Sequence, residues 1–260
     1  LTGKWISAGE RMIALYLNKN GEHKFIVNKL FPIEEDLGVE IVWYTDSEDS
    51  IKILSNIVNK NEALGVDKFW PAQYIIRLME LNAVKGFVNS SGIIDELRMV
   101  KDEEEKDLMR KSSKINDKVM EALKSELREG YTEKHYARLL AEIYENEGAQ
   151  GFSFDPILAY GENAADPHHE PDGTKLKKGD SLVIDIGGIY NHYCSDMTRT
   201  VFFGKEPSQE HRRIYEIVRN ANLNAISKVK DGVKFSDIDA AARDFITEEG
   251  FGILYSQNWT

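Results

Sequence analysis

Two aspartates, Asp185 and Asp196, are the strongest candidates for chemistry in this sequence. They lie eleven positions apart, each in a run of apolar and β-branched residues that is typical of a strand. An ionised carboxylate is costly to bury in such surroundings unless it is paired or holds a metal ion. Their position therefore points to a metal site.

The spacing also places both side chains on one face of a sheet. If the two strands form a hairpin that closes at Tyr190-Asn191, then Asp185 lies directly opposite Asp196. Directly opposed residues share a face, with Cβ atoms about 4.5–5.5 Å apart. Two carboxylates at that distance repel each other unless a cation lies between them. A bulge at Gly187-Gly188 would preserve this face if it inserted an even number of residues.

Oxygen ligands from two strands suit divalent cations, and two bridging carboxylates suit a pair of ions. Each ion needs about four to six ligands, so we expect further His and Glu ligands beyond these two aspartates. The alternative is a structural one, in which Asp185 is a satisfied core carboxylate and Asp196 pairs with Arg199.

Other polar residues near the two strands could assist the same chemistry. His168 lies in a polar loop before the hairpin and could donate to a carbonyl oxygen or to a developing oxyanion. The alternative is a solvated loop histidine, which is also how we interpret the neighbouring His169. Thr198 and Arg199 could orient the aspartates as outer ligands, although Arg199 could equally be a surface strand residue.

The composition excludes several other classes of function. The 260 residues carry a net charge of -11 without a basic block, so a nucleic acid is not an expected partner. A single cysteine, Cys194, rules out an internal disulfide framework and fits a reducing cytosol. We find no apolar run as long as a membrane span and no signal-peptide pattern. We therefore expect a cytoplasmic protein without a membrane partner, whose first residues, Leu1-Thr2-Gly3-Lys4, form an internal start.

Residues 1–98 alternate strand and helix patterns and predict an α/β domain. The turn at Asn20-Gly21 predicts a hairpin between the first two strands. The expected strands cover 13–17, 24–27, 39–44, 64–66 and 86–88, and the expected helices cover 47–58 and a segment that opens at Pro71.

Residues 99–260 predict a second domain of the α+β class. Asp102 and Glu105 form a capping box at the start of a long helix, and a second helix follows over 132–147. The expected strands cover 153–159, 181–190 and 193–203.

The helical part of this domain repeats at an offset of 102 residues. Arg128-Glu129-Gly130 matches Lys230-Asp231-Gly232, and Glu147-Gly148 matches Glu249-Gly250. The shared offset favours an internal duplication. The strands that carry the aspartates follow the first copy, whereas the chain reaches Thr260 ten residues after the second. We therefore expect the second set of strands to be absent.

Taken together, these motifs resemble the pita-bread metallopeptidases, and within them the Xaa-Pro dipeptidases (prolidases) and Xaa-Pro aminopeptidases. The resemblance covers nearly the whole chain. Its motifs are Leu1-Thr2-Gly3, Glu96-Leu97-Arg98-Met99-Val100-Lys101, Gly151-Phe152-Ser153-Phe154-Asp155-Pro156, Tyr160-Gly161-Glu162-Asn163-Ala164-Ala165, Pro167-His168-His169, Gly179-Asp180 and Ser195-Asp196-Met197-Thr198-Arg199-Thr200.

The resemblance implies a creatinase-like N-terminal domain over 1–98, its head missing, and a pita-bread catalytic domain over 99–260, its second set of strands missing. Asp185 would bind one of two divalent metal ions, Asp196 would bridge both, and His168 would assist the tetrahedral intermediate. Manganese or cobalt is the expected metal, with zinc or iron as alternatives. One histidine and two glutamates that complete the family's site are not present, so we expect this chain alone to be inactive.

The implied reaction is hydrolysis of the bond before proline, in Xaa-Pro dipeptides or short peptides with proline in second position, by a homodimer. Two alternatives stay open. One is a methionine aminopeptidase, and the other is a non-catalytic peptide-binding module on the same fold.

Overall fold

The structure is a computed structural model that describes residues 6–7 and 9–252. The chain divides into two compact units, Leu1–Val100 and Lys101–Thr260, so the boundary lies two residues beyond the expected one. The motif Leu1-Thr2-Gly3 lies outside the described residues. Within the described ranges, no helix is both long enough and apolar enough to cross a membrane.

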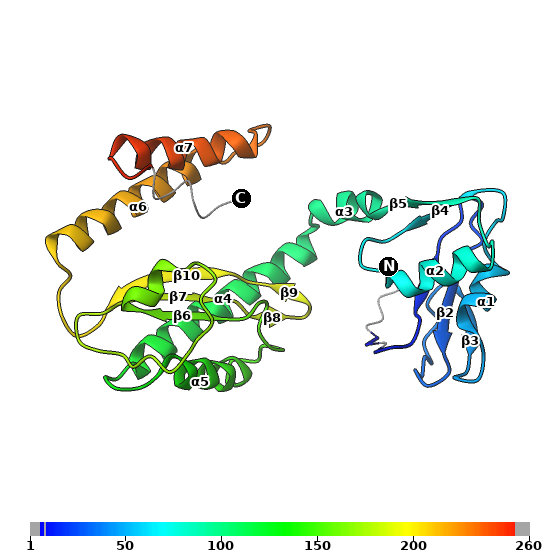
Figure 1. Ribbon diagram of the computed structural model, residues 1–260, viewed down its shortest axis with the longest axis horizontal. Helices are drawn as coiled ribbons and strands as arrows, with labels where there is room; N and C mark the ends of the chain where they lie inside the picture. The colour runs from blue at the N-terminus through cyan, green and yellow to red at the C-terminus, as the bar shows by residue number, and fades with distance from the viewer. Residues whose placement is uncertain (1–5, 8, 253–260) are drawn as a thin grey trace. The chain divides into compact units, whose positions relative to one another are not determined.

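The first unit has the expected alternation of strands and helices (Figure 1). Strands β1 (Ala14–Tyr16) and β2 (Lys24–Asn28) are antiparallel, as the Asn-Gly turn predicts, and β3 (Glu40–Tyr44) pairs parallel to β2. Strands β4 (Ala63–Val66) and β5 (Gly86–Asn89) form a separate parallel pair. The helices are α1 (Ser50–Ser55), α2 (Ala72–Glu80) and α3 (Ser91–Met99).

Two helices of this unit differ from the prediction. Helix α1 begins later than the predicted residue 47 because the side chain of Asp49 caps it by accepting from the N–H groups of Ile51 and Lys52, and it ends at Ser55 rather than at residue 58. Helix α3 was not predicted, since Gly92 lowers the helix propensity of a short segment.

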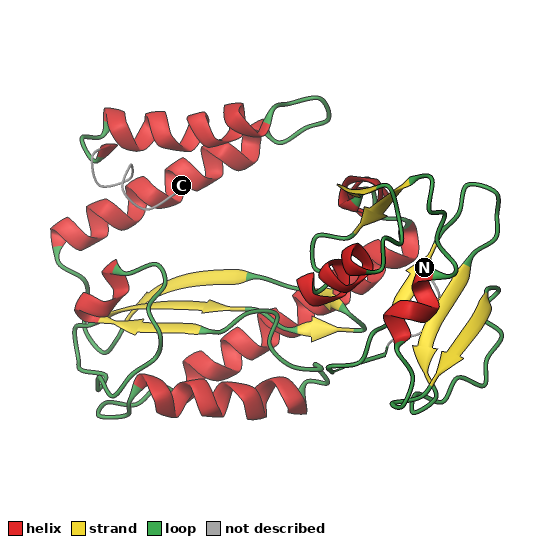
Figure 2. Cartoon of the chain, turned by 45° about the vertical axis from the view of Figure 1, so that its right-hand side comes forward, coloured by secondary structure: helices red, strands yellow, loops and turns green. Residues whose placement is uncertain are grey.

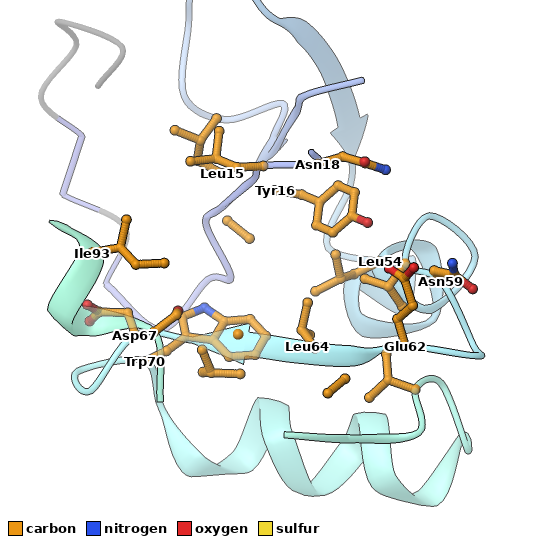
Figure 3. Close-up of a pocket in the computed structure, with 18 of the residues that line it drawn as sticks. Leu15, Tyr16, Asn18, Leu54, Asn59, Glu62, Leu64, Asp67, Trp70 and Ile93 are labelled. Atoms are coloured by element: carbon orange, nitrogen blue, oxygen red, sulfur yellow. The ribbon is translucent and has the colours of Figure 1, made fainter. Parts of the chain in front are cut away.

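A cavity of about 570 Å³ lies between residues of β1 and β4. Figure 3 shows the side chains around it, with the Trp70 ring on one side and Leu15 and Tyr16 across from it. The Trp70 indole Nε1 donates to the carbonyl of Ile13 at 3.4 Å. None of the candidate site residues lines this cavity.

The second unit begins with two helices packed against an antiparallel sheet. Helix α4 (Glu103–Glu126) opens with the predicted capping box, and α5 (Glu133–Asn146) is capped by Thr132. The sheet has the order β10 (Met197–Phe202), β7 (Ser181–Ile186), β6 (Ile157–Tyr160), as Figure 1 shows. Figure 2 draws its strands in yellow. Its core joins helix and strand residues that are almost fully buried, among them Leu123, Leu140, Tyr144, Leu158 and Ile184.

A second helical pair, α6 (Gln209–Lys228) and α7 (Phe235–Glu248), follows the sheet and forms a hairpin. Helix α7 begins and ends 102 residues after α5, so the predicted duplication is confirmed in the helices. The ends match as well. The N–H of Ala149 donates to the carbonyl of Tyr144 at 2.9 Å, and that of Phe251 to Ile246 at 3.0 Å.

Candidate metal site

Each of the two long predicted strands of the site is interrupted. Strand β7 is followed after Gly187-Gly188 by β8 (Ile189–Tyr190), and β9 (Tyr193–Cys194) is followed after two residues by β10. A Cβ at Gly187 would lie 2.2 Å from Ser153 Oγ and from the carbonyl oxygen of Ser195. Only glycine therefore permits this close approach.

Residues 150–153 fill the interruption. The N–H of Ser153 donates to the carbonyl of Gly187 at 3.0 Å, and its hydroxyl donates to the carbonyl of Ser195 at 2.8 Å. Phe152 also forms an isolated bridge with Gly188. This third segment fixes the backbone directly before Asp196.

The predicted pairing of Asp185 with Asp196 is wrong by two residues. Asp185 faces Thr198 across β7 and β10. The hairpin closes at Asn191-His192, which have φ of 45° and 69°, and not at Tyr190-Asn191. Two central residues with positive φ match the twist of a two-residue hairpin, and Asn adopts this conformation readily.

The shift is even, so it keeps both aspartates on the same face. Asp196 directly precedes β10, two positions before Thr198, and alternate residues of a strand share a face. Burial raises the pKa of the Asp196 carboxyl, and the nearby charge of Asp185 raises it further. The two carboxylates are therefore close enough to repel each other.

Thr198 contacts the carboxylate of Asp185 directly. Its Oγ1 donates to Asp185 Oδ1 at 2.6 Å, which fixes the orientation of that side chain. Arg199 Nη1 instead donates to the carbonyl of Thr198 at 2.8 Å. The alternative of an Asp196–Arg199 ion pair is wrong, because within residues 6–252 as described neither aspartate forms one.

The loop between β6 and β7 carries both candidate histidines. The side chain of His168 is exposed, and its backbone N–H donates to Asp166 Oδ1 at 2.9 Å. His169 is not the solvated residue that we predicted. Its side chain is only 13% exposed, and its Nε2 lies 2.7 Å from Glu133 Oε2.

Glu133 was not predicted to matter, although it is completely buried. It occupies the first position of α5, where the helix dipole favours an acidic residue. A glutamate at this position is common in helices, so the sequence alone does not mark it as a candidate. Its partners lie 27–39 residues away along the chain, so no local pattern connects them.

The donor set around Asp185 fits divalent cations. Both groups are carboxylates, which are the ligands that hard divalent ions prefer. They share one face, they repel each other, and in the described part of the chain no positive side chain neutralises them. Burial is the larger cause of the raised pKa of Asp196 and the charge of Asp185 the smaller one, and a bound cation would offset the repulsion between the two carboxylates.

Comparisons with known proteins identify relatives over nearly the whole chain. An uncharacterized peptidase of Staphylococcus aureus (strain MSSA476) is 35% identical, over 96% of this chain and 72% of the relative. A prolidase from Thermococcus sibiricus superposes with a TM-score of 0.87 at 33% identity, over 95% of this chain and 69% of that one. An X-Pro aminopeptidase from Thermotoga maritima MSB8 superposes with a TM-score of 0.80 at 29% identity, over 95% and 70%.

Two families match successive parts of the sequence. Residues 1–100 match the creatinase/prolidase N-terminal domain, and residues 107–258 match metallopeptidase family M24. The match to the M24 family includes both aspartates and their strands, and this family implies divalent metal ions. The chain therefore belongs to metallopeptidase family M24, with a creatinase-type domain preceding its pita-bread peptidase domain.

Proposed function

We propose that this chain belongs to a metal-dependent exopeptidase that hydrolyses the peptide bond before proline, and that it acts as an Xaa-Pro dipeptidase. One observation carries the proposal: Asp185 lies opposite Thr198, two positions after Asp196, so the two carboxylates project from one face of the sheet. The similarity to a prolidase over 95% of the chain supports the same class of substrate.

In this proposal, Asp185 and Asp196 hold two divalent ions, with Asp196 as the shared ligand. Manganese or cobalt is expected, and zinc or iron are the alternatives. Bound ions of this kind polarise a carbonyl oxygen and lower the pKa of water. Thr198 keeps the Asp185 carboxylate in a fixed orientation through its 2.6 Å hydrogen bond, and Arg199 supports the strand beside it.

His168 has the exposure that a group acting on substrate requires. In the proposed reaction it donates to the carbonyl oxygen of the scissile bond as negative charge develops there. The bond before proline is a tertiary amide without an N–H. A site that recognises the carbonyl oxygen is therefore suited to it, and the free amine of the substrate would lie near Asp185.

The substrates would be Xaa-Pro dipeptides or short peptides with proline in second position. A homodimer in the cytoplasm is part of the proposal, and the single cysteine is in keeping with that compartment. The creatinase/prolidase N-terminal domain disfavours a methionine aminopeptidase. Retention of Asp185, Asp196 and His168 disfavours a non-catalytic binding module.

The test compares the 260-residue chain with a chain extended to the length of its relatives. We expect the extended protein to bind metal and to cleave Ala-Pro or Met-Pro. The 260-residue chain should be inactive, because two carboxylates do not supply the ligands that two ions require. Cleavage of longer peptides by the extended protein would favour an aminopeptidase.

Asp196→Asn in the extended protein should abolish metal binding and activity together. Asp117→Asn, an exposed change on helix α4, is the matched control and should affect neither. Full activity of Asp196→Asn with normal metal content would refute the proposal.

A further inference from the structure

A buried carboxylate joins the loop that carries His168 to the helical layer. Glu133 is 0% exposed. Each of its two carboxylate oxygens takes part in two hydrogen bonds. Oε1 accepts from the N–H of Tyr160 at 2.9 Å and from Asn163 Nδ2 at 3.0 Å. Oε2 accepts from the N–H of Asp172 at 2.9 Å and lies 2.7 Å from His169 Nε2.

The four partners come from the first part of the connection between β6 and β7, from Tyr160 to Asp172. Tyr160 ends β6, Asn163 lies in the 3₁₀ turn Gly161–Ala165, and His169 and Asp172 lie near the middle of the loop. The start and the middle of the loop thus converge on one side chain.

Two further hydrogen bonds at Thr174 link different parts of the loop to each other. Thr174 Oγ1 accepts from Asn163 Nδ2 at 3.2 Å, and the N–H of Thr174 donates to Asp172 Oδ1 at 2.6 Å. The backbone on both sides of His168 is therefore held, although the ring of His168 itself remains exposed.

Three of the four contacts at Glu133 have a fixed direction. The two backbone N–H groups and the Asn163 amide can only donate to it. A carboxylate at Glu133 and a proton on His169 Nε2 satisfy all four contacts at once. The negative charge lies at the N-terminus of α5, where the helix dipole stabilises it.

The cluster of Glu133, His169 and Asp172 could in principle hold a metal ion, since one ligand atom of each lies within 4.8 Å of the others. The hydrogen bonds argue against this use. Each Glu133 oxygen already accepts two of them, which fills the acceptor capacity of the carboxylate.

We propose that Glu133 and His169 are positioning residues that set the place of His168 in the peptidase reaction. This inference rests on the proposed function. His168 and His169 are adjacent, with Cα atoms about 3.8 Å apart across the peptide bond, so anchoring one restrains the other. A misplacement of about 1 Å can reduce a rate by about 100-fold.

The test uses paired variants of His169. His169→Gln keeps a side-chain N–H that can donate to Glu133, whereas His169→Ala removes it. In the extended protein we expect His169→Ala to lower kcat by about 10- to 100-fold with little change in KM, and His169→Gln to restore most of the activity. Glu142→Gln, an exposed change on the same helix, is the control and should leave kcat unchanged.

A second measurement does not depend on activity. Hydrogen exchange in the 260-residue chain should be faster at residues 161–172 in Glu133→Gln and His169→Ala, and unchanged in α4 for His169→Ala. Normal exchange in this loop, or a normal kcat in His169→Ala, would overturn the positioning role while leaving the peptidase proposal intact. An extended wild-type protein that cleaves no Xaa-Pro peptide would instead refute the proposed function, and this role with it.

Discussion

The two helical pairs of the second unit have equivalent C-terminal ends but different surroundings. Gly148 and Gly250 both terminate their helices with positive φ, at 83° and 92°. In the first pair, the helices bury large side chains such as Leu123 and Tyr144 against the sheet. In the second pair, the buried cluster among the described residues consists of Ile217, Ala221 and Ile246, while Ile226 and Val229 are 57% and 62% exposed.

The first positions of α5 and α7 show the difference most clearly. They are equivalent at the offset of 102 residues, yet Glu133 is fully buried and Phe235 is 90% exposed. The repeated part of the sequence therefore specifies where the helices end, whereas the burial of equivalent positions differs between the two pairs. Four experiments test this contrast.

The largest effect should come from the first helical position. Glu133→Ala leaves buried donors without an acceptor, and each costs about 1–3 kcal/mol, so we expect a loss of about 4 kcal/mol in the free energy of unfolding. Phe235→Ala should change it by less than about 0.5 kcal/mol. Urea unfolding of both variants measures the difference, and equal losses would refute the contrast.

A smaller effect is expected for the cores. Leu123→Ala should lower the global free energy of unfolding by about 3 kcal/mol, because it leaves a cavity in the sheet-facing core. Ile246→Ala should instead act locally and speed hydrogen exchange in α6 and α7 alone. If Ile246→Ala also released the amides of β7, the two pairs would share one cooperative core.

The helix ends should respond alike. A Cβ at Gly148 or at Gly250 meets no atom within 4 Å, so only the left-handed backbone opposes it. We expect Gly148→Ala and Gly250→Ala to weaken their own helix ends by about 1–2 kcal/mol each, as measured by exchange of the last helical amides. A loss confined to one of them would contradict the equivalence of the two ends.

The smallest change concerns the strands that follow the first pair. The raised pKa of Asp196 means that the folded metal-free protein keeps this proton to a higher pH than the unfolded chain does. Stability should therefore fall as the pH rises from about 3.9 through the raised pKa. Asp196→Asn should remove this fall and raise the Tm of the metal-free protein at pH 7. A lower Tm in this variant would indicate that the carboxylate stabilises the fold.

The sequence predicted the elements with local signatures and missed the contacts that depend on tertiary structure. The capping box at Asp102, the hairpin of β1 and β2, and the duplication are confirmed. All three depend on residues close in sequence or on a shared offset.

The errors have a common physical origin. The predicted hairpin register was wrong because the turn forms at Asn191-His192, which both have positive φ, and not at Tyr190-Asn191. The role of His169 was wrong because its partner, Glu133, is 36 residues away. The first error concerns a local turn whose position one residue decides, and the second concerns a contact that no neighbouring residue signals. The shared face of Asp185 and Asp196 survived because a shift of two residues preserves strand alternation.

Ser153 illustrates how far the control of such a site can extend. It is not among the proposed ligands, yet its hydroxyl donates to the carbonyl of Ser195, 42 residues further along the chain, in the peptide group that leads into Asp196. A Ser153→Ala change would remove the hydroxyl and release that carbonyl. In the proposed metal site, the orientation of a ligand would then depend on a residue that binds no metal itself.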